Sequence, residues 1–465
     1  MRAVTMLAAA RGLSVGLWVM IGLMAFSSVA LFRGSGTNDD SVSLWLFSPT
    51  HQGLYEPMLE RAGSRVERPL DMRLMSIPAI ERKMMSGFFS GLPTADLIEC
   101  EKAVVGRAFT GPPESIGFLD LTDRLRDEGL LDQINGPSFG PWTSGGRIYG
   151  LPHDVHPVML GYRADLVEAA GIDLSGVETW RDYFDAMAPL MQDRDGDGQP
   201  DHWALAFWPT QLDNVEVLLL QGDGRFFDDA GAPVIDSPRN AELLAEIVSW
   251  CVGSERVAAD VADFSAYGHQ QRMDGYAIGY LCPDWMCAIW KEQLPPEAAG
   301  KFKLMPMPAF SAGGRRTSVR GGTMLGLPRD GEHIEEAWEY AKMLYTSEQA
   351  AHDLYVNTDI ITPVSALWGN PIFDEPDPFF GGQRKGRMYI DLAPDVPVRT
   401  SSPYNKQAVL LVSDAALSLT KFARKEQAYD APSLQEEAER LLGLAQEHIE
   451  RVMSRNAFAQ TEPSS

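Results

Sequence analysis

The sequence has few cysteines and an excess of negative charge, and both features narrow the functions open to it. Four cysteines occur in 465 residues, and the absence of a Cys-x-x-Cys pair leaves a zinc ribbon or a redox motif without support. The formal net charge of −24 disfavours nucleic acid and anionic membrane surfaces as partners. No G-x-S-x-G, H-E-x-x-H or P-loop pattern is present, so no catalytic residue is predicted.

Blocks of like charge, low-complexity tracts and repeats of solenoid period are also lacking. The composition, 45% hydrophobic and 22% charged, is that of a folded soluble protein. Because 465 residues exceed what one small core holds, the length predicts two lobes.

One long uncharged run is present, at residues 13–32, and Arg2 and Arg11 precede it. Together with the small residues Ser28–Ala30 it predicts an export signal within residues 1–33, cleaved to give a periplasmic or extracytoplasmic protein. The alternative is an uncut membrane anchor, since the run is just long enough to span a bilayer. No cysteine follows the run, which excludes lipid attachment through a lipoprotein cysteine.

Export permits disulfides, and the four cysteines allow three full connectivities. Cys282 and Cys287 flank four residues and would close a small loop. Four buried free thiols, with Cys100 and Cys251, are the alternative.

Strand-like and helix-like segments alternate after residue 41, which predicts an α/β fold. The segments are strands at Val42–Phe47, Asp71–Ile77 and Ala95–Glu99, and helices at 53–62 and 79–91. Ligands of such parallel sheets lie beyond the carboxyl ends of the strands. This rule points to Ser48–Thr50 and to Glu99–Glu101.

Later segments carry helix signals. Thr179 and Asp182 have the spacing of a capping box, and Ser237 with Pro238 begins a second helix. Apolar residues at helical spacing predict two more helices, at 333–345 and at 433–453, and the last of these is expected to close the fold.

Several blocks in order resemble a known family. They include "YGLPHDVHPVMLGYRADLVEAAGID", "ETWRDYFDAM", "MDGYAIGYLCPDWM" and "FKLMPMPAFSAGGRRTSVRGGTMLGLPRD". The sequence is similar here to the extracellular solute-binding proteins of ATP-driven importers, the family that includes the maltose-binding protein. The likeness covers nearly everything after residue 41.

The resemblance implies a two-lobed periplasmic binding protein type II fold, each lobe a mostly parallel sheet flanked by helices. It assigns residues 41–153 and 309–357 to lobe 1, residues 158–305 and 363–465 to lobe 2, and crossings near 154–157, 303–308 and 360–363. Solute would bind between the lobes, which close on it.

The resemblance also supplies candidate ligand-binding residues. Trp285 stands where related sugar-binding members present a stacking tryptophan, and Asp284, Glu99 and Glu101 would bind hydroxyls through charge-assisted hydrogen bonds. For each of these the alternative is a core side chain or a solvated charge. The weaker candidates are Trp45, Trp208, Gly321, Gly322, Thr323, Tyr404 and His156.

Two other groups of residues invite a binding role. His153 and His156 would point to opposite faces of a strand, so a place at the hinge or the cleft rim is expected rather than a metal site. Arg315, Arg316 and Arg320 would suit an anionic ligand, or else belong to an exposed hairpin.

The stretch "QDRDGDGQPDHW" matches part of a calcium loop. Its candidate ligands are Asp193, Asp195, Asp197, Gln199 and Asp201. Ala204 replaces the bidentate glutamate of such loops, so any site is expected to be weak. A turn in which aspartates bond their own backbone is the alternative. No other cofactor is expected.

We therefore predict a non-enzymatic receptor of an ABC importer that binds a mono- or oligosaccharide and presents it to a membrane permease. The alternatives are a secreted polysaccharide-degrading hydrolase or lyase, a receptor for another solute such as a glycerol phosphate, and a membrane-tethered sensor.

Overall fold

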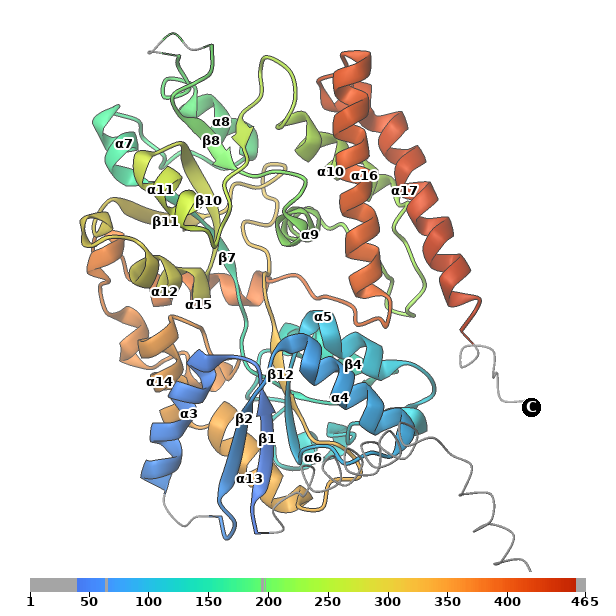
Figure 1. Ribbon diagram of the computed structural model, residues 1–465. Helices are drawn as coiled ribbons and strands as arrows, with labels where there is room; N and C mark the ends of the chain where they lie inside the picture. Colours follow the sequence, from blue (N-terminus) through green and yellow to red (C-terminus); the bar gives the residue numbers. More distant parts are fainter. Residues whose placement is uncertain (1–39, 63–65, 194–195, 197, 457–465) are drawn as a thin grey trace, which may run out of the picture.

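The protein forms two lobes, each built on a five-stranded sheet (Figure 1). The structure is a computed structural model that describes residues 40–62, 66–193, 196 and 198–456. The predicted two-lobed α/β fold is confirmed. The N-terminal apolar run lies outside the described residues, and within them no helix combines the length and apolar character needed to cross a bilayer.

The first lobe, lower in Figure 1, begins with the predicted β-α-β-α-β unit. Its sheet has the order β2 (Leu70–Leu74), β1 (Val42–Leu46), β3 (Leu97–Glu101), β12 (Thr323–Gly326) and β6 (Leu151–Pro152). Strand β1 pairs in parallel with β2 and with β3. The predicted strand at Asp71–Ile77 ends sooner, at Leu74, because Pro78 in the first turn starts the next helix.

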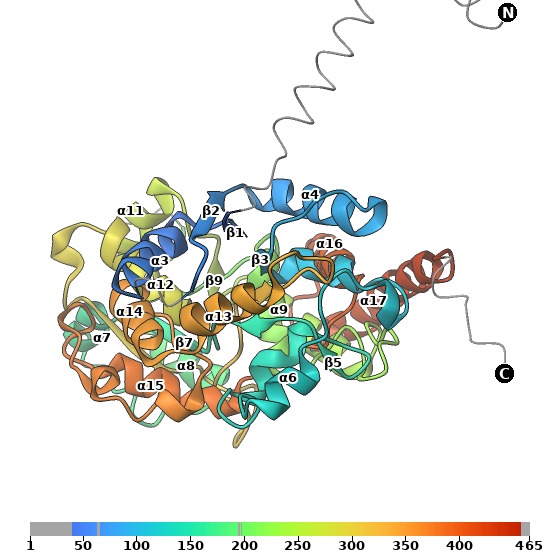
Figure 2. The same ribbon diagram turned by 90° about the horizontal axis from the view of Figure 1, so that it is seen from below.

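Helices cover both faces of this sheet, as the view from below shows (Figure 2). They are α3 (Pro49–Ala62), α4 (Ile77–Ser90), α5 (Lys102–Val105), α6 (Thr122–Asp127), α13 (Ile334–Tyr345) and α14 (Glu348–Thr358). A short hairpin, β4 (Thr143–Ser144) with β5 (Arg147–Ile148), lies beside them. The core packs leucines of the strands against aromatic rings of α3 and α13.

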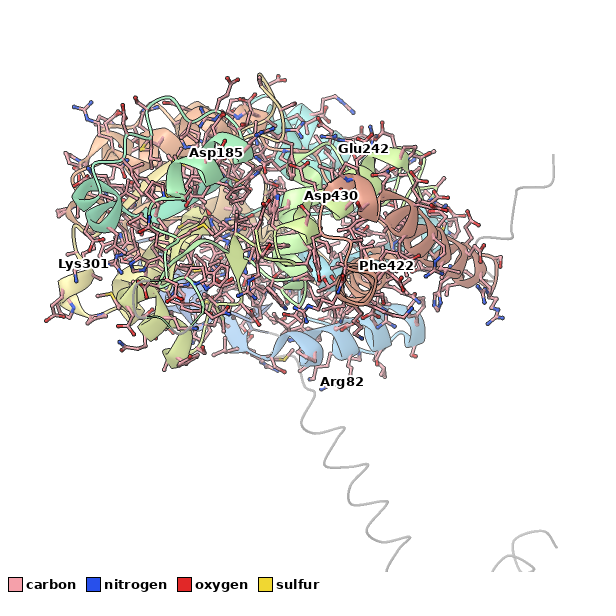
Figure 3. All side chains as sticks on the ribbon, turned by 90° about the horizontal axis from the view of Figure 1, so that it is seen from above. Arg82, Asp185, Glu242, Lys301, Phe422 and Asp430 are labelled. Atoms are coloured by element: carbon pink, nitrogen blue, oxygen red, sulfur yellow. The ribbon has the colours of Figure 1, made fainter. Side chains whose placement is uncertain are left out.

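The second lobe has the strand order β11 (Phe302–Pro306), β7 (Val158–Arg163), β10 (Ala277–Pro283), β8 (Trp203–Ala206) and β9 (Ala258–Ala259). Its helices are α7 (Ala164–Ala169), α8 (Trp180–Met187), α9 (Leu212–Gln221), α10 (Pro238–Ser249), α11 (Ala266–Asp274), α12 (Asp284–Gln293), α15 (Lys385–Leu392), α16 (Asn405–Glu426) and α17 (Ala431–Met453). Seen from above, Asp185 of α8, Glu242 of α10 and Asp430 before α17 lie at the outer surface (Figure 3).

Both sheets are mostly parallel, as predicted, and in each of them one strand of the five runs in the opposite direction. In the first lobe β12 runs antiparallel to β3 and to β6, and in the second lobe β7 runs antiparallel to β10 and to β11. The reason lies in the connections, since β7 enters its sheet directly from the other lobe, as β12 does. Without an intervening crossover helix, such a strand meets its neighbours from the opposite direction.

The chain passes between the lobes three times. The first crossing is residues 153–157, between β6 and β7, and the last is residues 359–363, where Ile361 accepts a hydrogen bond from the Val155 amide. The middle crossing was predicted near 303–308 but comes later. Thr317 and Ser318 still bond to the second lobe, at Val158 and Val217, so the chain crosses at 319–322.

The predicted helix signals are confirmed. Thr179 and Asp182 form a capping box at the start of α8, and the Ser237 side chain accepts from the Asn240 amide with Pro238 at the first position of α10. Helices α13 and α17 match the segments expected at 333–345 and 433–453. The four cysteines are buried free thiols, the second of the two arrangements considered, and the Sγ atoms of Cys282 and Cys287 lie 3.9 Å apart.

The capping box gives a first prediction. Thr179→Ala removes the side chain that accepts from the Asp182 amide, at 3.2 Å, and should lower the free energy of unfolding by about 1 kcal/mol. Urea titration of the purified protein measures this change. Arg181→Ala on the same helix is the control, because a side chain that is 91% exposed should contribute little. Equal midpoints for the two variants would contradict the assignment.

Candidate functional site

A buried histidine ties the crossing segments together. His156 lies in the first crossing with a positive φ of 53°, unusual for a residue other than glycine. Its Nε2 lies 3.0 Å from Asp154 and its Nδ1 lies 2.8 Å from Asp284. Burial lowers the pKa of His156 while the two carboxylates raise it, and the carboxylates prevail, giving a pKa of about 10. The ring is therefore a buried cation between two anions.

The two carboxylates connect this cation to the other crossings. Asp284 accepts the Trp285 amide on one oxygen and the Ile361 amide on the other, each at 2.8 Å. Asp154 accepts the Thr323 amide at 3.1 Å. All three crossing segments thus meet at the pair of carboxylates around one imidazole.

Two predicted ligand-binding residues are held by protein groups at this point. Asp284 is fully buried, and His156 is 5% exposed with both ring nitrogens engaged. Both side chains join the crossing segments, and a contact of either with a ligand stays a prediction.

Glu99 is likewise held by protein groups. Its carboxylate is fully buried in the first lobe, where it lies 2.9 Å from His51 Nδ1 and accepts the hydroxyls of Tyr55 at 2.9 Å and Tyr345 at 3.1 Å. Burial raises the pKa of Glu99, but the surrounding histidines and hydrogen bonds prevail and lower it. Its contact with a ligand stays a prediction.

Glu101 ends the same strand and stays near the lobe junction. It is the N-cap of α5, where its carboxylate accepts the Ala103 amide at 2.9 Å. Burial raises its pKa, although Lys102 beside it acts in the opposite direction. Thr323 lies opposite Glu101 in the antiparallel register of β12 and β3.

Trp285 lies half-buried at the start of α12. Its ring stacks on Phe264 with centroids 6.1 Å apart and an interplanar angle of 13°, and its Nε1 donates to the Arg320 carbonyl at 2.9 Å. Phe264 is 62% exposed. A stacked pair with one open ring is a suitable platform for the apolar face of a sugar, and this role of Trp285 stays a prediction.

Gly321 and Gly322 lie between this platform and the first lobe, with φ values of 103° and 131°. A Cβ on Gly321 would lie 2.7 Å from His156 Cδ2, and one on Gly322 would lie 2.8 Å from Arg399 Nη2. Close approach of the backbone therefore requires glycine at both positions. Whether their amides contact a ligand stays a prediction.

The remaining candidates lie apart from each other. Trp45 packs in the first-lobe core and is 6% exposed, as the alternative reading held. Trp208 lies half-buried between Arg256 and Arg424, and the hydroxyl of half-buried Tyr404 accepts from Asn456 at 2.9 Å.

The three arginines near residue 318 are held by protein groups. Arg315 and Arg316 donate to backbone carbonyls, and Arg315 also pairs with Asp223. Arg320 pairs with Asp263 at 2.7 Å. They therefore form neither an exposed hairpin nor a free anion site.

A cavity of about 220 Å³ opens between the lobes, and none of the predicted site residues lines it. Its walls come from α5, α9, α16 and the segment 398–401, and we call it the α5–α9–α16 cavity (Figure 1). Lys102 of the first lobe pairs with Glu216 of the second lobe inside it. One feature of the sequence indicated this place, since Lys102 directly follows the strand end that the ligand rule selects.

The aspartate-rich loop is described only in part, since Asp195 and Asp197 lie outside the described residues. The Asp193 carboxylate accepts the amides of Gly196 at 2.7 Å and Gly198 at 2.9 Å, as in a turn held by its own side chain. Gln199 donates its side-chain amide to the Gly198 carbonyl, and the Asp201 amide donates to the Gln192 carbonyl. Calcium binding here stays a prediction.

Known proteins resemble this chain in sequence and in fold. An arabinooligosaccharide-binding protein of Halalkalibacterium halodurans is 24% identical over 77% of this chain and 80% of its own length. A lactose-binding protein of Rhizobium radiobacter is 23% identical over 80% of this chain and 86% of its own. No protein-family profile matches the chain.

Among solved structures, the sugar-binding protein MalE of Xanthomonas citri superposes with a TM-score of 0.71, at 16% identity, over 89% of this chain and 99% of that one. An extracellular solute-binding protein of family 1 gives the same TM-score over 87% of this chain. This chain has the fold of the MalE-like solute-binding proteins. Its relatives in sequence are named as sugar-binding proteins.

The buried imidazolium gives a second prediction. The pKa of His156 in the folded protein lies above the value of about 6.5 in an unfolded chain. The charged ring therefore stabilises the fold fully below that pH, and this stabilisation is lost as the pH rises toward 10. His156→Asn, which tolerates the positive φ, should cost about 3 kcal/mol at pH 6 and progressively less at higher pH.

The measurement is the free energy of unfolding of both proteins from pH 6 to pH 10. His448→Asn is the matched control, because His448 is exposed on α17 and bonds only to Gln407 at 3.0 Å. A penalty for His156→Asn that is the same at both ends of the range would refute the charged state of His156.

Proposed function

We propose that the protein is an exported receptor of an ABC importer and that it binds a mono- or oligosaccharide between its lobes. The observation that carries the proposal is the α5–α9–α16 cavity, to which both lobes contribute side chains, Lys102 from one and Glu216 from the other. A ligand held by both lobes favours their closed arrangement by its differential affinity for that form.

The sequence relatives favour a carbohydrate. Those compared above bind arabinooligosaccharides and lactose, and similar structures hold sugars such as β-1,6-galactobiose and maltose. Trp285 and Phe264 supply a flat apolar surface of the kind that a pyranose ring covers. The mechanism is binding and release, with no bond made or broken.

Two parts of the proposal concern the cell. The closed receptor would dock on a membrane permease and deliver the solute there. Residues 1–33 would direct export and would either be removed at Ala30 or remain as a tether, and N-terminal sequencing of the mature protein distinguishes the two.

A structural calcium ion in the 193–201 loop is a further proposal, tested by a rise in the unfolding temperature on adding calcium.

The central test measures ligand binding together with ligand fate. A saccharide at 100 times its Kd should stabilise the protein by about 2.7 kcal/mol, and small-angle scattering should show a more compact particle. Chromatography should recover the saccharide intact. Cleavage of an oligosaccharide or polysaccharide would favour the hydrolase or lyase alternative, and a response only to glycerol phosphates would favour a receptor for another solute.

Trp285→Ala gives a third prediction. Loss of the ring removes about half of the stacked platform, so saccharide affinity should fall at least tenfold, equivalent to about 1.4 kcal/mol. Isothermal titration measures the affinity. Tyr267→Ala on α11 is the control, because that aromatic ring is 73% exposed. Equal affinity of the two variants would place the saccharide elsewhere.

A further inference from the structure

The α5–α9–α16 cavity is basic although the chain as a whole is strongly acidic. Four cations line it, Lys102, Arg225, Arg399 and Lys406, against two carboxylates, those of Asp213 and Glu216. The whole chain shows the opposite balance, with 64 acidic and 40 basic residues. A local excess of cations in such a protein attracts an anionic ligand into the cleft.

Arg399 is the cation that lacks a counter-ion. Its Nη2 donates to the Gly321 carbonyl, while its Nη1 is buried without a hydrogen-bond partner. It makes no ion pair with a carboxylate of the described residues, although the side chain is half-buried. A buried guanidinium nitrogen without a hydrogen-bond partner is costly, and the forked donors of arginine suit a carboxylate.

The other cations are already matched. Lys102 pairs with Glu216. Burial raises the pKa of Glu216, but the attraction of Lys102 and Arg399 prevails and lowers it. Arg225 and Lys406 are exposed at the rim and lie 3.9 Å and 3.8 Å from the carboxylates of Asp229 and Glu81. Asp213 is exposed at the rim as well. Among the four cations that line the cavity, Arg399 is therefore the one without a carboxylate of the described residues at ion-pair distance, although Glu101 and Glu216 attract it from farther away.

The remaining wall is apolar. Leu212, Val398 and Leu410 are unusually exposed for large apolar side chains, at 36%, 62% and 46%, and all three line this cavity. Phe226 adds a half-buried aromatic ring. A ligand that fits must therefore combine an apolar face with a single negative charge, as the pyranose ring of a uronic acid does.

We propose that the α5–α9–α16 cavity binds a saccharide that carries a carboxylate, with Arg399 as the counter-ion of that carboxylate. The proposal rests on the function proposed above and names its class of ligand. Arg399 donates to the Gly321 carbonyl and Trp285 to the Arg320 carbonyl, so both side chains contact the same crossing segment. Arg399 then determines the preference for acidic over neutral saccharides.

The test compares matched acidic and neutral saccharides by isothermal titration. The probes are galacturonate and digalacturonate against galactose and galactobiose, with glucose 6-phosphate as the phosphate arm. The uronates should bind at least tenfold more tightly than their neutral counterparts, and raising the salt from 20 mM to 300 mM should weaken the uronates alone.

Three variants assign the effect to the cavity. Arg399→Gln should weaken uronate binding at least tenfold, and Arg399→Lys, which keeps the charge, should weaken it less. Lys406→Glu places a like charge at the exposed rim and should weaken uronate binding several-fold without a loss of folding. Arg181→Gln, an exposed arginine on α8, is the matched control and should change nothing.

Each outcome decides a separate point. Tighter binding of the neutral sugars, or uronate binding that all three cavity variants leave intact, overturns this inference and leaves the proposed function standing. Tighter binding of glucose 6-phosphate than of the uronates would show that the site prefers a phosphate to a carboxylate, and would also overturn this inference. Failure of every saccharide to bind would overturn the proposed function and this inference together. Thermal unfolding of each variant shows that it is folded.

Discussion

The imidazolium of His156 between Asp154 and Asp284 is the interaction on which the two-lobed arrangement depends. Asp154 and His156 belong to the first crossing and Asp284 to the second lobe, and all three are buried where the crossing segments meet. Removing one partner from such a group leaves a buried charge without compensation, which costs more than the pair itself contributes. These contacts hold the crossing segments together at the junction of the lobes, which we call the pivot.

The pivot extends into the first lobe through a series of contacts. The His153 ring lies near the Asp154 carboxylate, at 3.4 Å from Nδ1, and its centroid is 4.4 Å from that of His51. His51 in turn contacts Glu99 on β3. A polar network thus runs from the first-lobe sheet to the N-terminus of α12, directly beside Trp285. Trp285, the predicted sugar platform, is therefore bonded to residues that also form the junction of the lobes, Asp284 and Arg320.

The fold could largely be predicted from local sequence. The β-α-β-α-β unit was predicted from alternating segments, because the hydrophobic period and the turn residues of each strand and helix are local features. The capping box at Thr179 and Asp182 was predicted from a spacing of three residues. The strand directions could not be predicted this way. They depend on which lobe a strand enters from, and β12 enters from the other lobe.

The site was harder to predict for a physical reason. The rule of the strand ends pointed to the end of β3, where Lys102 lines the cavity, yet it could not say that Glu99 would be taken up by His51 and by Tyr345, 246 residues away. The cavity likewise brings together Lys102, Glu216 and Arg399, which share no motif and meet only in the folded protein. Trp285 and the two glycines were chosen from the family resemblance, since their respective neighbours Arg320, His156 and Arg399 are distant in the sequence.

The placement of β12 has a consequence for how the chain is made. This strand joins β6 to the rest of the first-lobe sheet, yet it lies more than 170 residues after β6 in the sequence. The first lobe therefore cannot complete its sheet until most of the polypeptide has been synthesised, and contacts of such long range form slowly. A nascent chain that completes its sheet late stays unfolded for longer, which is compatible with the export proposed above.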